Sequence, residues 1–167
     1  MLTEIEVLHD VTRRLDSLAL PYMLTGSLAL GYYAQPRMTR DIDIVLALSD
    51  IDVSRLVAAL SDEYYVPEAL ARSAVSRGAV FNVIHSKSIV KVDFIVRRDS
   101  PYRHHEFDRR REVEIESAKV SIVSKEDLVL SKLAWALPSR SELQLRDVAN
   151  LLASGCDLEY LHRWARD

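Results

Sequence analysis

Cysteine is almost absent from this chain, since Cys156 is the only one among its 167 residues. A single thiol excludes an intrachain disulfide and argues against a zinc site built from cysteines. The chain also has no apolar run long enough to cross a membrane. Residues 1–20 mix Glu, His, Asp and Arg with apolar side chains, which is not the composition of a signal peptide. We therefore expect a cytoplasmic protein with no membrane partner.

An excess of charge of one sign is missing as well. The 22 Lys and Arg residues against 25 Asp and Glu residues give a formal net charge of -3, which excludes a uniformly basic clamp for nucleic acid. Hydrophobic residues make up 49% of the chain, enough for one hydrophobic core and too many for a disordered chain. The length favours one domain, which we divide into a core at residues 1–123 and a helical segment at residues 124–167 packed on it.

Hydrophobic periodicity and turn residues predict an alternation of helices and strands in the first half of the chain. The expected elements are a helix over 5–20, a strand over 22–25, a turn at Gly26-Ser27, a helix over 28–34, a strand over 41–48, and helices beginning near Ser49 or Asp50 and near Pro67.

The second half is expected to contain a hairpin followed by a helical tail. Its expected elements are strands over 80–85 and 89–96, an irregular charged stretch over 97–111, one or two strands within 113–123, and helices over 128–137, 141–153 and 157–165. Pro138 is expected to end the first of these three helices. The order of elements predicts an α+β fold in which a mixed β-sheet is flanked by helices, with further helices at the C-terminus.

Two aspartates alternate with isoleucine on the most clearly predicted strand. Side chains on a strand alternate between faces, so Asp41 and Asp43 point the same way while Ile42 points into the core. Their Cα atoms are expected about 6.6 Å apart, close enough for both carboxylates to bind one divalent cation, or two cations about 3.5–4 Å apart. The pattern therefore favours a metal site for phosphoryl chemistry.

A third carboxylate stands in the middle of an otherwise apolar strand. Asp93 lies within Lys91-Val-Asp-Phe-Ile95, where an unpaired carboxylate is costly. If this strand neighbours the strand of Asp41, three carboxylates converge, and without a cation they would repel one another. Magnesium, or manganese in its place, binds carboxylate oxygens and keeps coordination positions open for substrate phosphates.

The pair Gly26-Ser27 falls between a short strand and a helix. Glycine lets the backbone approach a phosphate closely, and the start of the following helix offers free N–H groups and a favourable dipole. Ser27 adds a hydroxyl donor. This pair is therefore a candidate for binding the phosphates of a nucleotide.

Each part of this pattern has a plainer interpretation when it is taken alone. An Asp-x-Asp sequence often only caps a turn, a Gly-Ser pair is less specific still, and a lone Asp in an apolar strand more often faces solvent at the edge of a sheet. The order of strand, Gly-Ser, helix, Asp-x-Asp strand and later Asp strand is far more specific than any part. Taken together, the pattern favours a catalytic site.

In this order and strand context, Gly26-Ser27, Asp41-Ile42-Asp43 and Asp93 resemble the signature of the DNA polymerase beta-type nucleotidyltransferase superfamily. The segment Arg37-Met-Thr-Arg40-Asp41-Ile-Asp43 is similar to the Arg-x-Thr-x-Asp-x-Asp form found in small prokaryotic members, which include minimal, antibiotic and toxin nucleotidyltransferases. The similarity covers roughly residues 20–96. One departure is the gap between Ser27 and Asp41, which holds 13 residues and is slightly longer than is usual in the minimal members.

The resemblance implies a magnesium-dependent enzyme that transfers a nucleoside monophosphate from a nucleoside triphosphate to an acceptor hydroxyl. It implies that Asp41 and Asp43 hold the metal ions, and that Asp93 shares in metal binding and accepts the proton of the acceptor. Ser27 and nearby backbone N–H groups would hold the outer phosphates. Arg40 would add a contact to phosphate, or would instead pair with Asp41.

The C-terminal part resembles a helical segment of toxin-type and related members, in which a lysine on one helix and an aspartate on the next face the nucleotide. Lys132 is then a candidate contact for the triphosphate, and Asp147 would orient it or bind substrate. The alternative for this pair is a surface salt bridge.

Two other polar groups invite a functional interpretation. His104 and His105 are adjacent, so their side chains would point apart in an extended segment, and no third ligand has a helpful spacing; we do not expect a metal there. The stretch 97–111 contains six arginines and would follow the phosphates of an RNA acceptor. A solvated loop of mixed charge is the favoured interpretation of that stretch.

Three functional hypotheses stay open at this point. The first is an active enzyme whose acceptor is an RNA end, a protein or a small molecule; a homodimer would complete its acceptor site, and as a toxin it would act with an antitoxin partner. The second is a non-catalytic nucleotide-binding module of the same fold, which has little need for a costly Asp93. The third treats the carboxylates as structural ligands of one calcium or magnesium ion, and it leaves Gly26-Ser27 unexplained.

Overall fold

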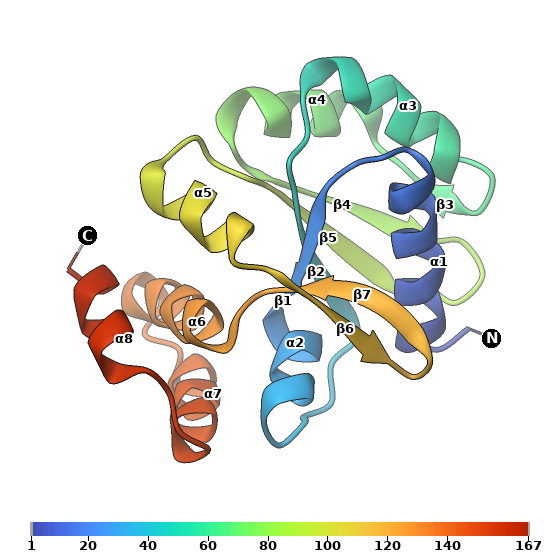
Figure 1. The fold of residues 1–167 in the computed structure, drawn as a ribbon. Coiled ribbons are helices and arrows are strands. Elements are labelled where there is room, and N and C mark those ends of the chain that lie inside the picture. Colours follow the sequence, from blue (N-terminus) through green and yellow to red (C-terminus); the bar gives the residue numbers. More distant parts are fainter. Residues whose placement is uncertain (1, 167) are drawn as a thin grey trace.

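A computed structural model describes residues 2–166 of the chain, and Figure 1 shows their arrangement. The helices of this part are α1 (Glu4–Ser17), α2 (Gly26–Tyr33), α3 (Asp50–Leu60), α4 (Glu68–Arg77), α5 (Pro101–Asp108), α6 (Lys125–Ser139), α7 (Glu142–Ala153) and α8 (Leu158–Trp164). The strands are β1 (Tyr22–Thr25), β2 (Asp41–Leu46), β3 (Tyr64–Tyr65), β4 (Val80–His85), β5 (Lys91–Val96), β6 (Arg111–Ile115) and β7 (Ala118–Ile122).

The described strands form a single sheet in the order β3-β4-β5-β2-β1-β7-β6. The pairs β2–β5 and β1–β7 are parallel, whereas β1–β2, β3–β4, β4–β5 and β6–β7 are antiparallel. The short strand β3 and the strand β6 lie at the two ends of this order. The mixed sheet with helices around it confirms the predicted α+β fold.

Alternation of side chains divides the central strands into a covered face and a more open face. In β2 the covered positions are Ile42, Ile44 and Leu46, and in β5 they are Val92, Phe94 and Val96; all six are buried in the core. Their neighbours in sequence are only half-buried. The period-two pattern of these strands therefore fixes which side chains remain accessible for chemistry.

The helices fall into two groups around the sheet (Figure 1). Helix α1 contacts β2 and β7, α4 contacts β4, and α3 packs against both α1 and α4. Helix α2 contacts β1 and β2, and also α6 and α7, so it connects the sheet to the C-terminal helices. On α6, Leu128 and Val129 belong to the same hydrophobic core as the sheet. The division into residues 1–123 and 124–167 stays a prediction.

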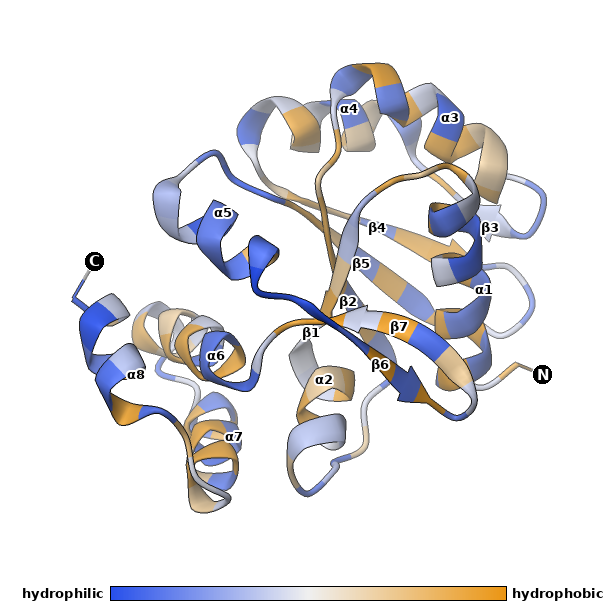
Figure 2. Ribbon diagram, viewed as in Figure 1, coloured by the Kyte–Doolittle hydropathy of each residue, from blue (hydrophilic) through white to orange (hydrophobic). Residues whose placement is uncertain are grey.

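The stretch 97–111 contains a helix, so the prediction of an irregular segment was wrong. Helix α5 begins after Ser100, whose hydroxyl accepts a hydrogen bond from the Arg103 backbone N–H, and Pro101 suits the first helical turn. Figure 2 shows α5 as mostly hydrophilic, although its Phe107 is buried. Hydrophobic periodicity misses such a helix because charged residues and histidines, rather than aliphatic side chains, make up most of its sequence.

Smaller differences concern the ends of elements. Helix α6 continues through Pro138 and ends at Ser139, because a proline in the last turn removes only one intrahelical donor. Strand β5 begins at Lys91 rather than at Ile89, whose φ of 61° belongs to a turn. Strand β2 ends at Leu46, and β3 was not predicted. Within residues 2–166, none of the helices is both long enough and apolar enough to cross a membrane.

Candidate active site

Three aspartates of the predicted site lie side by side on the open face of the sheet. Strands β2 and β5 are adjacent, which is the condition under which the carboxylates were expected to converge, and they run parallel, with Asp43 opposite Asp93 and Asp41 opposite Lys91. All four residues occupy half-buried positions of the alternating pattern. Parallel pairing in this register brings the carboxylates together because residues opposite one another point to the same face.

A lysine that the sequence interpretation overlooked lies among these carboxylates. The Lys91 Nζ atom is 3.1 Å from Asp93 Oδ2 and 3.4 Å from Asp41 Oδ2. Among the residues that the structure describes, no three His, Cys, Asp or Glu side chains are close enough together to share a metal ion. The positive charge between Asp41 and Asp93 is that of the Lys91 ammonium. Its place two residues before Asp93 is the signal in the sequence that could have found it, because period two puts it on the same face.

The electrostatics around Asp43 indicate an excess of negative charge. Burial and, after it, the charges of Asp93 and Asp41 raise the pKa of Asp43 to about 6, although Lys132 and Lys91 oppose the rise. A carboxyl group with a raised pKa lacks sufficient compensation for its charge. The facing carboxylates of Asp43 and Asp93, with this deficit, therefore suit a divalent cation, which binds oxygen ligands and would supply the missing positive charge.

Gly26 lies directly against the carboxylate of Asp43. Its backbone has a φ of 68°, in the left-handed region that favours glycine. A Cβ atom at this position would be 2.0 Å from Asp43 Oδ2, so no other residue fits without displacing that side chain. Helix α2 begins at Gly26, and Ser27 is buried in its first turn. The strand, Gly-Ser and helix thus adjoin the carboxylates, as the order of motifs predicted.

Lys132 and Asp147 form a buried ion pair between α6 and α7, so the interpretation as a surface salt bridge was wrong. Lys132 Nζ is 2.7 Å from Asp147 Oδ2, and each side chain is about 5% exposed or less. Arg37 donates from Nε and Nη2 to the same carboxylate at 3.1–3.2 Å. Although burial opposes it, hydrogen bonds from Arg37 and Lys132 lower the pKa of Asp147.

Two positive charges, those of Lys132 and Arg37, therefore share the one negative charge of Asp147. The charge of Lys132 acts on the pKa of Asp43, which ties this cluster to the carboxylates. Arg37 was not predicted as a partner of Asp147, because the two residues are 110 positions apart and no local pattern links them. The cluster carries one positive charge in excess, which suits a neighbouring anion such as a polyphosphate.

Replacing Asp147 with Asn should destabilise the protein by about 3 kcal/mol, since two buried or partly buried cations lose their shared counter-charge. Lys132→Met should cost less, about 1 kcal/mol, because Arg37 still pairs with Asp147 in that variant. Urea denaturation of both variants measures the difference. Equal destabilisation by the two substitutions would contradict the shared role of Asp147.

Arg40, His104 and His105 lie outside the ion pairs described above. Arg40 is exposed, and the ion pair that Asp41 forms is with Lys91. His104 Nε2 is 2.8 Å from Asp99 Oδ1, and His105 stacks on Trp164 with ring centroids 4.8 Å apart. These contacts account for both histidines without a ligand.

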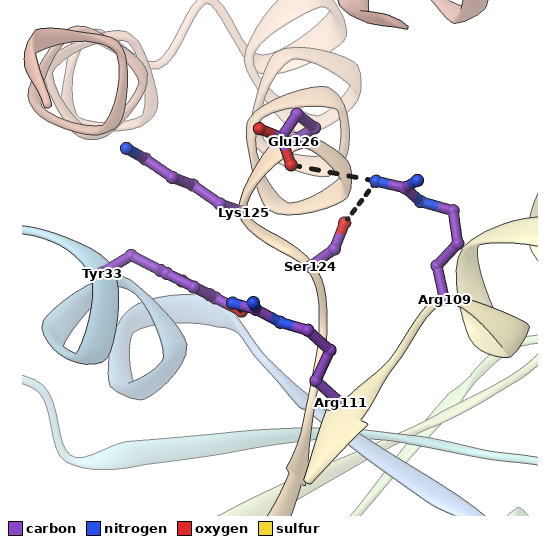
Figure 3. A pocket seen from close by; sticks show the side chains of 6 residues that line it. All are labelled: Tyr33, Arg109, Arg111, Ser124, Lys125 and Glu126. Carbon is purple, nitrogen blue, oxygen red and sulfur yellow. Dashed lines mark hydrogen bonds and ion pairs between the residues drawn. The ribbon is translucent and has the colours of Figure 1, made fainter. Parts of the chain in front are cut away.

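A separate open cavity of about 380 Å³ lies where α2, β6 and α6 meet, and Figure 3 shows its side chains. Arg111 donates to the Tyr33 hydroxyl at 3.0 Å, and Arg109 pairs with Asp127 at 3.0 Å. The lining residues are Tyr33, Arg109, Arg111, Ser124, Lys125 and Glu126. None of the three aspartates lines this cavity, so it is distinct from the carboxylate cluster.

Comparison with known proteins adds a family and a fold. Residues 2–167 match the family described as "Nucleotidyltransferase of unknown function (DUF6036)". Among solved structures, the lincosamide antibiotic adenylyltransferase LnuA with lincomycin bound has a TM-score of 0.60 and 17% identity, over 90% of this chain and 96% of its own. ANT(2'')-Ia in complex with adenylyl-2''-tobramycin has a TM-score of 0.65 and 14% identity, over 99% and 96%.

A third similar structure is an antigenic nucleotidyltransferase-like protein from Paracoccidioides brasiliensis. Its TM-score is 0.61 and its identity is 19%, over 89% of this chain and 75% of its own. A search of curated proteins found no match. Identities this low show a shared fold, and the match to the family extends over nearly the whole chain.

Proposed function

We propose a metal-dependent transfer reaction for this chain, which belongs to the nucleotidyltransferase family that matches residues 2–167. In this reaction the protein moves a nucleoside monophosphate from a nucleoside triphosphate to an acceptor hydroxyl. Transfer of nucleotidyl groups follows from the family itself. The observation that carries the finer proposal is the register of β2 and β5, in which Asp43 faces Asp93 beside Gly26.

The carboxylates are the proposed metal ligands. Asp41, Asp43 and Asp93 would hold Mg²⁺ or Mn²⁺, which neutralises the charge of the triphosphate and of the leaving pyrophosphate. Asp93 is the proposed general base. Its side chain is less exposed than that of Asp41, the other aspartate that Lys91 contacts, and it lies opposite Asp43. As the acceptor oxygen bonds to the α-phosphorus, its proton passes to Asp93 and the bond to pyrophosphate breaks.

Phosphate binding is proposed for residues around the carboxylates. The backbone N–H groups at the start of α2 and the Ser27 hydroxyl would bind the outer phosphates. Lys132 lies near Asp43 and shares Asp147 with Arg37, so this cluster would attract the triphosphate through its excess positive charge. The exposed Arg40 would add a contact from the open side.

The acceptor is proposed to be a hydroxyl group, with a small molecule favoured over RNA and protein. ANT(2'')-Ia, which covers this chain almost completely, was solved with an adenylylated antibiotic. LnuA of similar length was solved with lincomycin. These likenesses support a small-molecule acceptor, and the experiment below distinguishes it from the other two classes.

Incubation with an α-labelled nucleoside triphosphate, Mg²⁺ and separate pools of RNA, protein and metabolites should transfer label to one pool. A γ-labelled triphosphate should instead release its label as pyrophosphate. Asp93→Asn, which keeps the shape of the side chain, should lower the transfer rate by about 10²-fold or more through loss of the base. Thin-layer chromatography and gel analysis measure both labels.

Two outcomes would contradict the proposal. Transfer of the γ-label to an acceptor would mean that the protein is a kinase, because the bond to the γ-phosphate would then break instead of the bond between the α-phosphorus and pyrophosphate. Binding of nucleotide by the wild-type protein without transfer to any pool would favour the non-catalytic binding module.

A further inference from the structure

We propose that the Lys91 ammonium is a built-in substitute for the metal ion. It occupies the gap between Asp41 and Asp93 while no metal is bound, weakens the binding of free metal ions, and moves to the phosphates when metal and nucleotide bind together. This inference rests on the proposed function, because it assigns a role to a residue inside that site. Its consequence is that metal ions and nucleotide bind with strong mutual dependence.

The position of Lys91 follows from strand register. Lys91 is opposite Asp41, and Asp93 is two residues further along the same strand, so all three side chains share the open face of the sheet. The Nζ atom lies 3.1 Å from one carboxylate and 3.4 Å from the other. An ammonium group between two carboxylates supplies the positive charge that a metal ion would supply there.

The ammonium is free to leave this position. The side chains of Lys91 and Asp41 are 36% and 50% exposed, so neither is locked by packing. A lysine carries its charge on a flexible four-carbon stem and gains new partners by rotating that stem. The open face of β5 therefore allows Lys91 to exchange its carboxylates for another anion.

The charge of Lys91 explains why a free metal ion should bind this site more weakly than a metal ion that arrives with a nucleotide. A divalent cation that enters the gap alone meets the Lys91 charge at contact distance, and like charges repel strongly in a partly buried site. The same ion entering with a nucleotide brings phosphate oxygens, which give the displaced ammonium a new counter-charge. Binding of one partner thus improves binding of the other by the same factor.

Mn²⁺ binding to the nucleotide-free protein tests this inference directly, with calorimetry and the Mn²⁺ resonance signal as readouts. Lys91→Met should bind Mn²⁺ about tenfold more tightly than the wild-type protein, because the competing charge is gone. Lys91→Arg keeps the charge and should not show this gain. Lys87→Met is the matched control: it removes the same charge from the exposed turn before β5 and should change the affinity less than twofold.

The same proteins with α,β-methylene ATP provide a second readout. In the wild-type protein the analogue should tighten Mn²⁺ binding strongly, and in Lys91→Met this enhancement should shrink by about tenfold. Circular dichroism verifies that each variant is folded.

The outcomes separate this inference from the proposed function. An unchanged or weaker Mn²⁺ affinity in Lys91→Met, together with loss of Mn²⁺ binding in Asp41→Asn, would overturn the role of Lys91 and leave the metal site intact. Absence of Mn²⁺ binding in the wild-type protein and in Lys91→Met, with and without nucleotide, would overturn both proposals.

Discussion

Asp43→Asn is expected to lower the rate of nucleotidyl transfer by about 10³-fold while making the metal-free protein more stable. The loss of activity follows because the amide cannot replace a charged oxygen ligand. The gain in stability follows because the charge of Asp43 is partly removed from water and lies beside two other carboxylates. A substitution that lowers activity and raises stability indicates a residue whose role is chemical rather than structural.

The gain in stability should depend on pH in a defined way. An unfolded aspartate has a pKa of about 3.9, whereas the folded protein holds that of Asp43 at about 6. Below pH ~4 the group is protonated in both states, so wild type and variant should differ little. Between these two values the folded wild-type protein loses stability as pH rises, and above pH ~6 the loss is constant, at about 3 kcal/mol.

Urea denaturation in EDTA at pH 4 and pH 8, beside a transfer assay, measures both effects. Asp41→Asn is the matched control: it makes the same change two residues away, at a side chain that is half exposed. That variant should lose activity without a comparable gain in stability. A destabilised Asp43→Asn protein at pH 8 would contradict the excess of negative charge.

Gly26→Ala is expected to lower activity by about 10²-fold, because a displacement of about 1 Å at a reacting site has that effect. The new methyl group would overlap Asp43 Oδ2, and the carboxylate would have to move. The left-handed backbone adds its own strain, so stability should fall by about 3 kcal/mol in total. Thermal unfolding and the transfer assay measure the two effects.

Gly155→Ala separates backbone strain from the contact with Asp43. Gly155 also has a positive φ, 84°, yet nothing lies within 4 Å of the place that its Cβ would take. This control should cost about 1 kcal/mol and leave activity unchanged. A Gly26→Ala protein that behaved like the control would show that Asp43 has room to move without losing its function.

The carboxylates of the site are predictable because they rest on local rules. Period-two alternation puts Asp41 and Asp43 on one face from the sequence alone, and the apolar surroundings of Asp93 mark it as unusual. The sheet order that brings β5 beside β2 was only a condition of the sequence argument, because no local pattern requires it, and the structure meets that condition. The family signature supplied that link.

The contacts made by long side chains are harder to predict. Arg37 meets Asp147 across 110 residues, and Lys91 turns toward two aspartates rather than toward solvent. Periodicity places Lys91 on the face of the aspartates, but it gives neither the partners of Lys91 nor the pairing of Arg37, because flexible charged side chains form their contacts only after the backbone has folded. Helix α5 was missed for the related reason that its capping residues, rather than an apolar stripe, define it.

Other expectations concern the partners, the biological role and the cellular location of the protein. A homodimer, an antitoxin partner, action as a toxin and a cytoplasmic location all stay predictions. The roles of Asp41, Asp43, Asp93, Gly26, Ser27, Arg40, Lys132 and Asp147 are likewise proposals for the experiments above.

The order of the strands also bears on how variants of this protein would behave at high concentration. Unpaired backbone groups at the margins of a sheet can recruit another chain and start aggregation. Here one outermost strand, β3, has only two residues, and the other, β6, carries the charged residues Arg111, Glu112 and Glu114. The strands β2 and β5, which carry the candidate site, are interior, so substitutions of their aspartates leave both outermost strands unchanged and should not promote aggregation.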